Sequence, residues 1–219
     1  FQKIDIDGLI LRRVLKIIEV FIFIYLEGNT KDDYSNQFEC IITNLIELVN
    51  VISSPLTDPN VHIQKAQKWL PYIIDLLGRI SKYKNASFCL SQKKPLCDLF
   101  QIYDNLDCTM KSHLLEVFIN VFINNSDSIA EYIEDPDVSD TCYNFFDVII
   151  NDSIDSLQNF GEEERKNKAS LICESLYNLF TIDNDIKNNI FATEEIIEFL
   201  DEYQDFNDCF DWCRKVREL

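Results

Sequence analysis

Glycine and proline are scarce in this chain, with four and five residues among 219. A β-sandwich needs turn residues about every 8 to 12 positions, so this scarcity argues against an all-β fold. The glycines are also isolated from one another, at Gly8, Gly28, Gly78 and Gly161. None of them sits in the glycine-rich loop that cradles a nucleotide phosphate. The sequence therefore favours helices and gives nucleotide binding no support.

A long uncharged apolar stretch is missing as well. The most apolar segment, residues 9–28, is interrupted by Arg12, Arg13, Lys16 and Glu19, which leave seven uncharged residues at 20–26. A membrane span needs about 20 mostly apolar residues. We therefore expect no membrane partner, and we expect this segment to be a helix buried on most sides. Because the chain opens on Phe1 and not on Met, we also expect it to be part of a longer protein.

Residues that commonly carry catalysis are few. The two histidines, His62 and His113, have no nearby partners that would make a nucleophile and base pair. Cys209 and Cys213 are four residues apart and could supply half of a zinc site, but the chain has no Cys-x-x-Cys or close histidine pair for the other half. The sequence therefore predicts no catalytic site, no cofactor and no metal, and it favours core packing for both cysteines.

The eight cysteines are spread along the chain, at Cys40, Cys89, Cys97, Cys108, Cys142, Cys173, Cys209 and Cys213. Most fall at apolar positions of predicted helices, where a free cysteine behaves as a small hydrophobe. This favours a reducing, intracellular location, in the cytoplasm or the nucleus. The alternative is a secreted protein with four disulfides, which the glycosylation triplets at Asn85, Asn124 and Asn151 would suit.

Apolar residues recur at intervals of three and four along most of the chain, and short polar clusters interrupt them. This spacing predicts an all-α fold. The long helices are predicted at residues 9–27, 36–52, 61–83, 95–106, 109–124, 139–160, 162–180, 193–203 and 206–217. Pro71 favours a kink or a restart within the third of them. Shorter helical turns are predicted at 86–91, 127–134 and 184–191.

Three stretches repeat one layout, in which a long amphipathic helix is followed by a polar break, a short helix and another apolar helix. They are residues 76–100, 117–146 and 176–200. Equivalent positions at Ile80, Val121 and Leu179 are separated by 41 and 58 residues. The first interval lies within the roughly 40–47 residues of armadillo and HEAT units, and the second implies an insertion.

This layout resembles the armadillo and HEAT superfamily of helical repeats. The third stretch carries the resemblance best, because residues 178–179 close one repeat, 183–189 form a polar turn and 196–200 start the last helix. It lacks the glycine that usually opens the turn between helices. The resemblance implies a right-handed superhelical stack with a concave binding groove and no particular partner. We expect one such domain over residues 1–219.

Charge is distributed unevenly along the chain. Residues 1–126 hold 14 acidic and 13 basic residues, whereas residues 127–219 hold 24 acidic and 7 basic residues. A field of that sign repels nucleic-acid backbones, so we expect no nucleic acid to bind the acidic half. A partner of that half should be basic.

Two acidic stripes follow from helical spacing in the acidic half. In the helix predicted from residue 139, polar residues recur at steps of three and four and form one face, opposite the apolar side. This polar face consists of Asp140, Asn144, Asp147, Asn151 and Asp155. In the helix at 193–203, Glu195, Glu198 and Glu202 lie opposite Ile196, Ile197, Leu200 and Tyr203. By the resemblance, both helices would line the groove. An ordinary solvated face would give the same pattern.

Two further features bear on binding. Trp212 falls off the apolar stripe of its helix, and we expect it to be partly exposed and a candidate interface anchor. The basic segment at residues 79–94 carries five Lys and Arg, and it could be a solvated loop between repeats or a docking site for an acidic partner or a second copy.

These features predict a non-catalytic scaffold or adaptor that binds a basic partner segment along a helical-repeat groove. One alternative is a regulatory or chaperone-like cofactor that docks on a folded partner. Another is a structural segment of a large assembly subunit.

Overall fold

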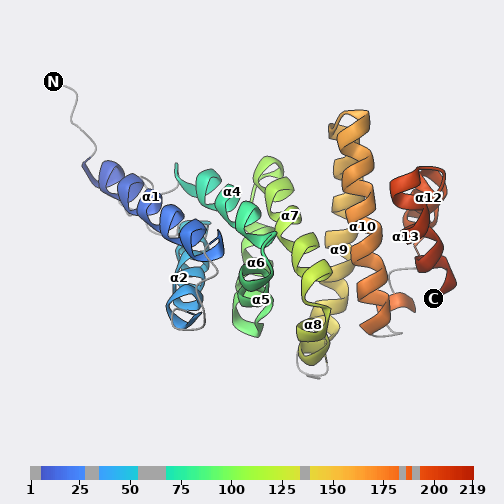
Figure 1. Cartoon of the computed structure of the whole chain (residues 1–219), viewed down its shortest axis with the longest axis horizontal. Helices are drawn as coiled ribbons and strands as arrows, with labels where there is room; N and C mark the ends of the chain where they lie inside the picture. Colours follow the sequence, from blue (N-terminus) through green and yellow to red (C-terminus); the bar gives the residue numbers. More distant parts are fainter. Residues whose placement is uncertain (1–5, 28–34, 54–67, 134–138, 183–185, 189–192) are drawn as a thin grey trace. The chain divides into compact units, whose positions relative to one another are not determined.

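The computed structural model describes residues 6–27, 35–53, 68–133, 139–182, 186–188 and 193–219. Every regular element in these ranges is a helix, and they contain no strand, so the all-α prediction is confirmed. The chain divides into two compact units, Phe1–Val117 and Phe118–Leu219 (Figure 1). The expected single domain over residues 1–219 stays a prediction.

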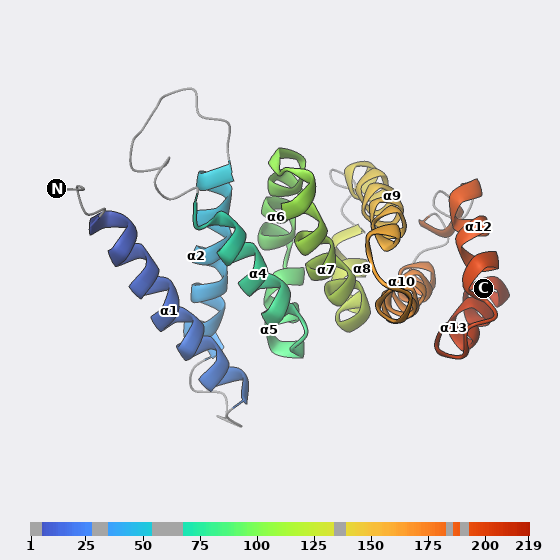
Figure 2. The same ribbon diagram turned by 90° about the horizontal axis from the view of Figure 1, so that it is seen from above.

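The first unit is built around helix α2. It contains α1 (Ile6–Glu27), α2 (Ser35–Ser53), α4 (Leu70–Ser81), α5 (Lys84–Ser91), α6 (Lys93–Asn105) and the first part of α7 (Cys108–Asn124). Helix α2 contacts α1, α4, α5 and α6 (Figure 1 and Figure 2). Its buried residues recur at helical spacing and form one apolar face, made of Phe38, Ile42, Leu45, Ile46, Val49 and Ile52.

The helices that follow α2 start and end close to where the sequence predicts. Pro71 lies in the first turn of α4, where its missing amide hydrogen removes no helical hydrogen bond. The predicted turn at 86–91 is an eight-residue helix, α5, with Ala86 and Leu90 completely buried. Helix α4 begins at Leu70, next to Pro71. Residues 61–67 of the same predicted helix lie outside the described residues.

A largely buried carboxylate, that of Glu19, joins α1 to α4. Glu19, with a side chain 14% exposed, accepts hydrogen bonds from Lys16 Nζ at 2.7 Å, Tyr72 Oη at 2.5 Å and Arg79 Nη2 at 2.8 Å. Arg79 also donates through Nε to Asp75 at 3.0 Å. Burial alone would raise the pKa of Glu19, but these three hydrogen bonds outweigh it and lower that pKa to about 2. The carboxylate stays ionised at the contact between the two helices.

Helix α1 is less buried than the sequence predicts. Leu15 and Ile22 are buried against the unit, whereas Ile17 and Ile24 are 69% and 64% exposed. The expectation of burial on most sides is wrong, because the apolar residues of α1 occupy two faces. Described contacts with α2 and α4 cover one of them.

The basic segment at residues 79–94 is mostly helical. Lys84 begins α5, and Lys93 and Lys94 lie in α6, so a solvated loop between repeats is the wrong interpretation. Lys82 pairs with Glu116 of α7 at 2.7 Å, and Lys94 pairs with Glu47 of α2. These cations hold neighbouring helices of the first unit together. Each of these exposed ion pairs contributes less than about 1 kcal/mol to the stability of the fold.

The second unit is built around helix α10. After the end of α7 it contains α8 (Ser126–Ile133), α9 (Ser139–Ser156), the 3-10 helix η1 (Leu157–Asn159), α10 (Glu162–Ile182), α12 (Glu194–Tyr203) and α13 (Asn207–Glu218). Helix α10 contacts α8, α9, η1, α12 and, most extensively, α13. Its buried face consists of Ala169, Ile172, Cys173, Ser175, Leu176, Leu179 and Phe180.

Within the second unit, an amide side chain and aromatic pairs hold the end of α7 against α9 and α10. The side chain of Asn178 in α10 donates to the carbonyl oxygens of Phe122 and Ile123, at 3.4 and 3.1 Å. Terminal carbonyls of a helix have no partner within that helix, so these bonds satisfy groups that would otherwise be buried unpaired. Phe122 also packs edge-on against Phe146 of α9, with ring centroids 5.3 Å apart.

Helix boundaries agree with the predicted ones to within about three residues in most of the chain. The helix predicted at 139–160 ends in η1, so its last turn is tighter than expected. Most of the turn predicted at 184–191 lies outside the described residues. In the part of the chain that is described, no helix is long and apolar enough to cross a bilayer.

Replacing Glu19 by glutamine should destabilise the protein by about 2 kcal/mol at neutral pH, because the hydrogen bonds of a buried charged group are lost. A depressed carboxyl pKa stabilises the fold above the unfolded pKa and loses that effect as the group is protonated. The difference in the free energy of unfolding between the variant and the unchanged protein should therefore shrink as the pH falls from about 4.5 to about 2. Urea denaturation at several pH values measures it.

The matched control is Asp75→Asn, because Asp75 shares Arg79 but is half exposed. This substitution should lower the free energy of unfolding by less than about 1 kcal/mol. Equal effects of the two substitutions, or a Glu19→Gln effect that does not change with pH, would contradict the account of the α1–α4 contact.

Candidate acidic interaction site

The acidic stripe predicted on α9 is largely present in the structure. Asn144 and Asp155 are exposed, while Asp147 and Asn151 are half-buried. The Asn151 side chain donates to Asp147 Oδ1 at 3.1 Å, one helical turn away. Asp140 lies in α9, but its side chain is outside the described residues.

The stripe predicted on α12 is exposed along its length. Glu195, Glu198 and Glu202 all face solvent, and Ile196, Leu200 and Tyr203 are buried on the other side. Ile197 was expected on the buried side but is 44% exposed. It lies on the border between the two faces, where the neighbouring helices no longer cover it.

The two stripes are linked electrostatically through Asp147 and Glu195. Helices α9 and α12 are in contact within the second unit. Burial raises the pKa of Asp147, the hydrogen bond from Asn151 opposes this, and the negative charge of Glu195 raises the pKa further. Two carboxylates from different helices therefore repel each other in one electrostatic field. We refer to the described acidic residues of the two stripes, Asp147, Asp155, Glu195, Glu198 and Glu202, as the acidic face.

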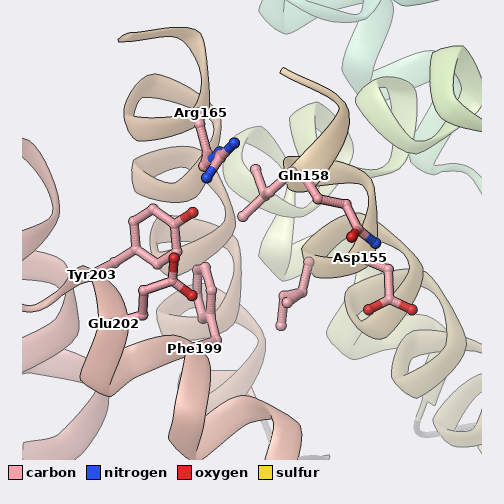
Figure 3. Close-up of a pocket in the computed structure, with 8 residues that line it drawn as sticks. Asp155, Gln158, Arg165, Phe199, Glu202 and Tyr203 are labelled. Atoms are coloured by element: carbon pink, nitrogen blue, oxygen red, sulfur yellow. The ribbon is translucent and has the colours of Figure 1, made fainter. Parts of the chain in front are cut away.

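A cavity of about 190 Å³ opens beside the acidic face, between α9, η1, α10 and α12 (Figure 3). The stripes contribute one carboxylate each to its lining, from Asp155 and Glu202, and α12 adds the Phe199 ring. Its complete lining is Ile154, Asp155, Leu157, Gln158, Arg165, Phe199, Glu202 and Tyr203. The cavity is large enough for one long side chain and carries both charge and apolar surface.

Two residues of this cavity, Arg165 and Tyr203, were not identified as site residues from the sequence. They point toward one another across it (Figure 3). Burial raises the pKa of Tyr203, the charge of Glu202 adds to the rise, and Arg165 opposes it. Arg165 donates through Nη2 to the carbonyl of Phe160 at 3.2 Å, and its buried Nε has no hydrogen-bond partner among the described residues. Helical spacing alone does not indicate that Arg165 faces α12.

Trp212 in α13 is half-buried, as the sequence predicts. Its ring lies against Tyr177 of α10, with centroids 5.6 Å apart, and Lys215 Nζ lies 3.9 Å from the ring centroid. A cation at this distance is attracted to the face of the ring. Trp212 is therefore held in place by α10 and its own helix, and its role as an interface anchor stays a prediction.

The predicted core packing of Cys209 and Cys213 is confirmed, and Cys173 of α10 joins them. All three are buried, and the sulfur atoms of Cys173 and Cys213 are 3.5 Å apart. The hydrogen bond with Cys213 raises the pKa of Cys173, and burial adds to the rise. Phe210 of the same helix is 52% exposed, because it lies at the edge of the α10–α13 contact. The described residues contain no group of three or more potential ligands arranged to hold a metal.

Neither histidine is among the described residues of this site. His113 is an exposed residue of α7, and His62 lies outside the described residues.

Comparison with protein-family models, with characterised proteins and with solved structures gives no match for this chain. The resemblance to armadillo and HEAT repeats therefore stays a prediction.

Replacing Glu195 by glutamine should lower the pKa of Asp147, because the repelling charge is removed while burial is unchanged. The side-chain carboxyl carbon of Asp147 reports this pKa in an NMR titration. Glu198→Gln is the matched control, one turn farther along α12, and should leave that pKa largely in place. An Asp147 pKa that is the same with and without the Glu195 charge would show that the two stripes are not coupled.

Proposed function

We propose that this protein is a non-catalytic interaction module, a scaffold or adaptor, whose second unit binds a basic segment of a partner protein along the acidic face. The acidic face carries this proposal, because it gathers five carboxylates on two helices that contact each other. Neighbouring anions are stabilised when a cation approaches them. Complementary charge across an interface speeds association and selects the partner.

The cavity beside the acidic face supports the same interpretation. A lysine or arginine side chain combines an apolar stem with a charged head. Phe199 offers surface for such a stem, and Glu202 offers a carboxylate for the head. Arg165 would oppose a cation at its own end of the cavity, so the head group should lie toward the carboxylates. The cavity therefore suits one anchoring basic side chain of the bound segment.

The proposal includes a finer architecture than the all-α fold. We propose that each unit stacks its helices as armadillo- or HEAT-like repeats, in a right-handed α-solenoid. In support, α2 contacts α1 before it in the chain and α4, α5 and α6 after it, and α10 likewise contacts helices on both sides. Repeat proteins are held together by such contacts between neighbours in sequence.

An intracellular location, in the cytoplasm or nucleus, is part of the proposal. The seven cysteines whose side chains are described are free thiols. Secreted proteins more often pair their cysteines in disulfides. The sulfur atoms of Cys173 and Cys213 are close together but form no disulfide in this structure.

Reversing two charges of the acidic face, with Glu198→Lys and Glu202→Lys together, should weaken binding of a basic segment by about tenfold or more. The probe is a fluorescent peptide of alternating lysine and serine, and anisotropy gives its dissociation constant. For the unchanged protein, the affinity should fall steeply between about 50 mM and 500 mM salt, because salt screens exposed charges.

The matched control is Glu39→Lys with Asp104→Lys, which makes the same change in net charge at exposed residues of the first unit. It should leave most of the affinity intact. The proposal fails if both double variants weaken binding equally, because net charge alone would then explain it. It fails as well if the affinity does not depend on salt.

A further inference from the structure

The outer face of α1 carries a row of exposed apolar side chains. The row consists of Val14, Ile17, Val20, Phe21 and Ile24. Elsewhere in the described residues, large exposed apolar side chains occur singly on their helices, as with Val51 on α2 and Phe88 on α5. Single exposed apolar residues are ordinary, whereas a contiguous row marks an interaction site.

The row has the spacing of a helix-pairing seam. Val14, Ile17, Phe21 and Ile24 follow one another at intervals of three, four and three residues. This is the a and d pattern of the heptad repeat, in which each side chain packs into a hole formed by a second helix. The seam extends for about 15 Å along α1, which corresponds to about one and a half heptads of a partner helix.

The opposite face of α1 is already used within the first unit. Phe23 packs edge-on against Tyr83, with ring centroids 6.1 Å apart, and Tyr25 stacks on Phe38 at 4.5 Å. Leu15 and Ile22 are buried on the same side. The exposed row is therefore additional to the apolar residues that fold the unit.

The charges near the row are basic at its amino-terminal end. Arg12, Arg13 and Lys16 are exposed, and together with Ile17 they line an open hollow of about 400 Å³. Glu19 lies among them in sequence but turns toward α4, where Tyr72 and Arg79 hold it. The outer face thus combines an apolar seam with exposed positive charge.

We propose that the outer face of α1 binds an amphipathic helix of a partner protein, and that acidic residues flank the apolar stripe of that helix. The heptad spacing specifies a helix, and the exposed arginines specify the sign of its charge. A lipid surface fits less well, because it offers no holes of the kind into which side chains at heptad spacing pack. This site lies in the first unit and does not depend on the acidic face.

The probe is a fluorescent peptide of about three heptads, with leucine at positions a and d and glutamate at positions e and g. Repulsion between its glutamates keeps the peptide from pairing with itself. Binding is measured by anisotropy at about 150 mM salt, where charges more than about 8 Å apart are screened, so the acidic half of the chain repels the peptide little. We expect saturable binding.

The double variant Ile17→Gln with Ile24→Gln should weaken this binding by about tenfold or more, because two knobs of the seam are removed. The matched control, Val51→Gln with Phe88→Gln, removes exposed apolar residues elsewhere in the same unit and should bind as the unchanged protein does. All four positions are more than half exposed. Circular dichroism should therefore show unchanged helix content and thermal midpoint in both variants.

The charge of the partner is tested by a second peptide with lysine in place of glutamate. The acidic peptide should lose affinity in the Arg12→Glu with Arg13→Glu variant. If the basic peptide binds at all, its affinity should be the same for the unchanged protein and for the double variant Ile17→Gln with Ile24→Gln. The proposal is overturned if neither peptide binds, or if the seam variant leaves binding of the acidic peptide unchanged.

Two other occupants of the face would also overturn the proposal, and each has its own readout. Sedimentation that shows a dimer abolished by Ile17→Gln with Ile24→Gln would assign the face to a second copy of the chain. Flotation with phosphatidylserine vesicles that is abolished by the same variant would assign it to a lipid surface. We expect a monomer and no flotation in these two experiments.

Discussion

Burial of one face of α10 is the constraint on which the second unit depends. That face provides the apolar surface that α8, α9, α12 and α13 share. Burying each aliphatic side chain contributes about 1.5 to 3 kcal/mol, so several such residues outweigh any surface ion pair in the unit. The orientation of α9 and α12 about α10 therefore follows from their apolar sides. The charged sides of both helices face outward as a consequence.

Carboxylates have basic partners in both units, as with Glu19 beside Arg79 in the first and Asp201 beside Arg217 in the second. Asp147 differs from these, because the charge of Glu195 raises its pKa. A fold rarely keeps unfavourable charge without a use for it, and perturbed carboxylates cluster at functional sites. This contrast is the physical basis for assigning binding to the acidic face and not to the paired charges.

Periodicity in the sequence predicted the helices and most of their faces. It placed Asn144 and Asp155 on a polar face, and Ile196 and Leu200 on an apolar one, because their spacing is regular. It did not predict the exposure of Ile17, because spacing shows that a residue is on an apolar face but not whether a neighbour covers it. The partners of Arg165 and Cys173 likewise depend on helices distant in sequence. Contacts of this kind come from tertiary packing, which no local pattern encodes.

The central claim, that the acidic face is a binding surface, is tested most directly by amide hydrogen exchange with and without a lysine-rich peptide. Exchange resolves each helix separately and needs no substitution. The account predicts that added protection is concentrated in α9 and α12. Protection confined to the first unit or to α13, with α9 and α12 exchanging at the same rate as in the free protein, would contradict it.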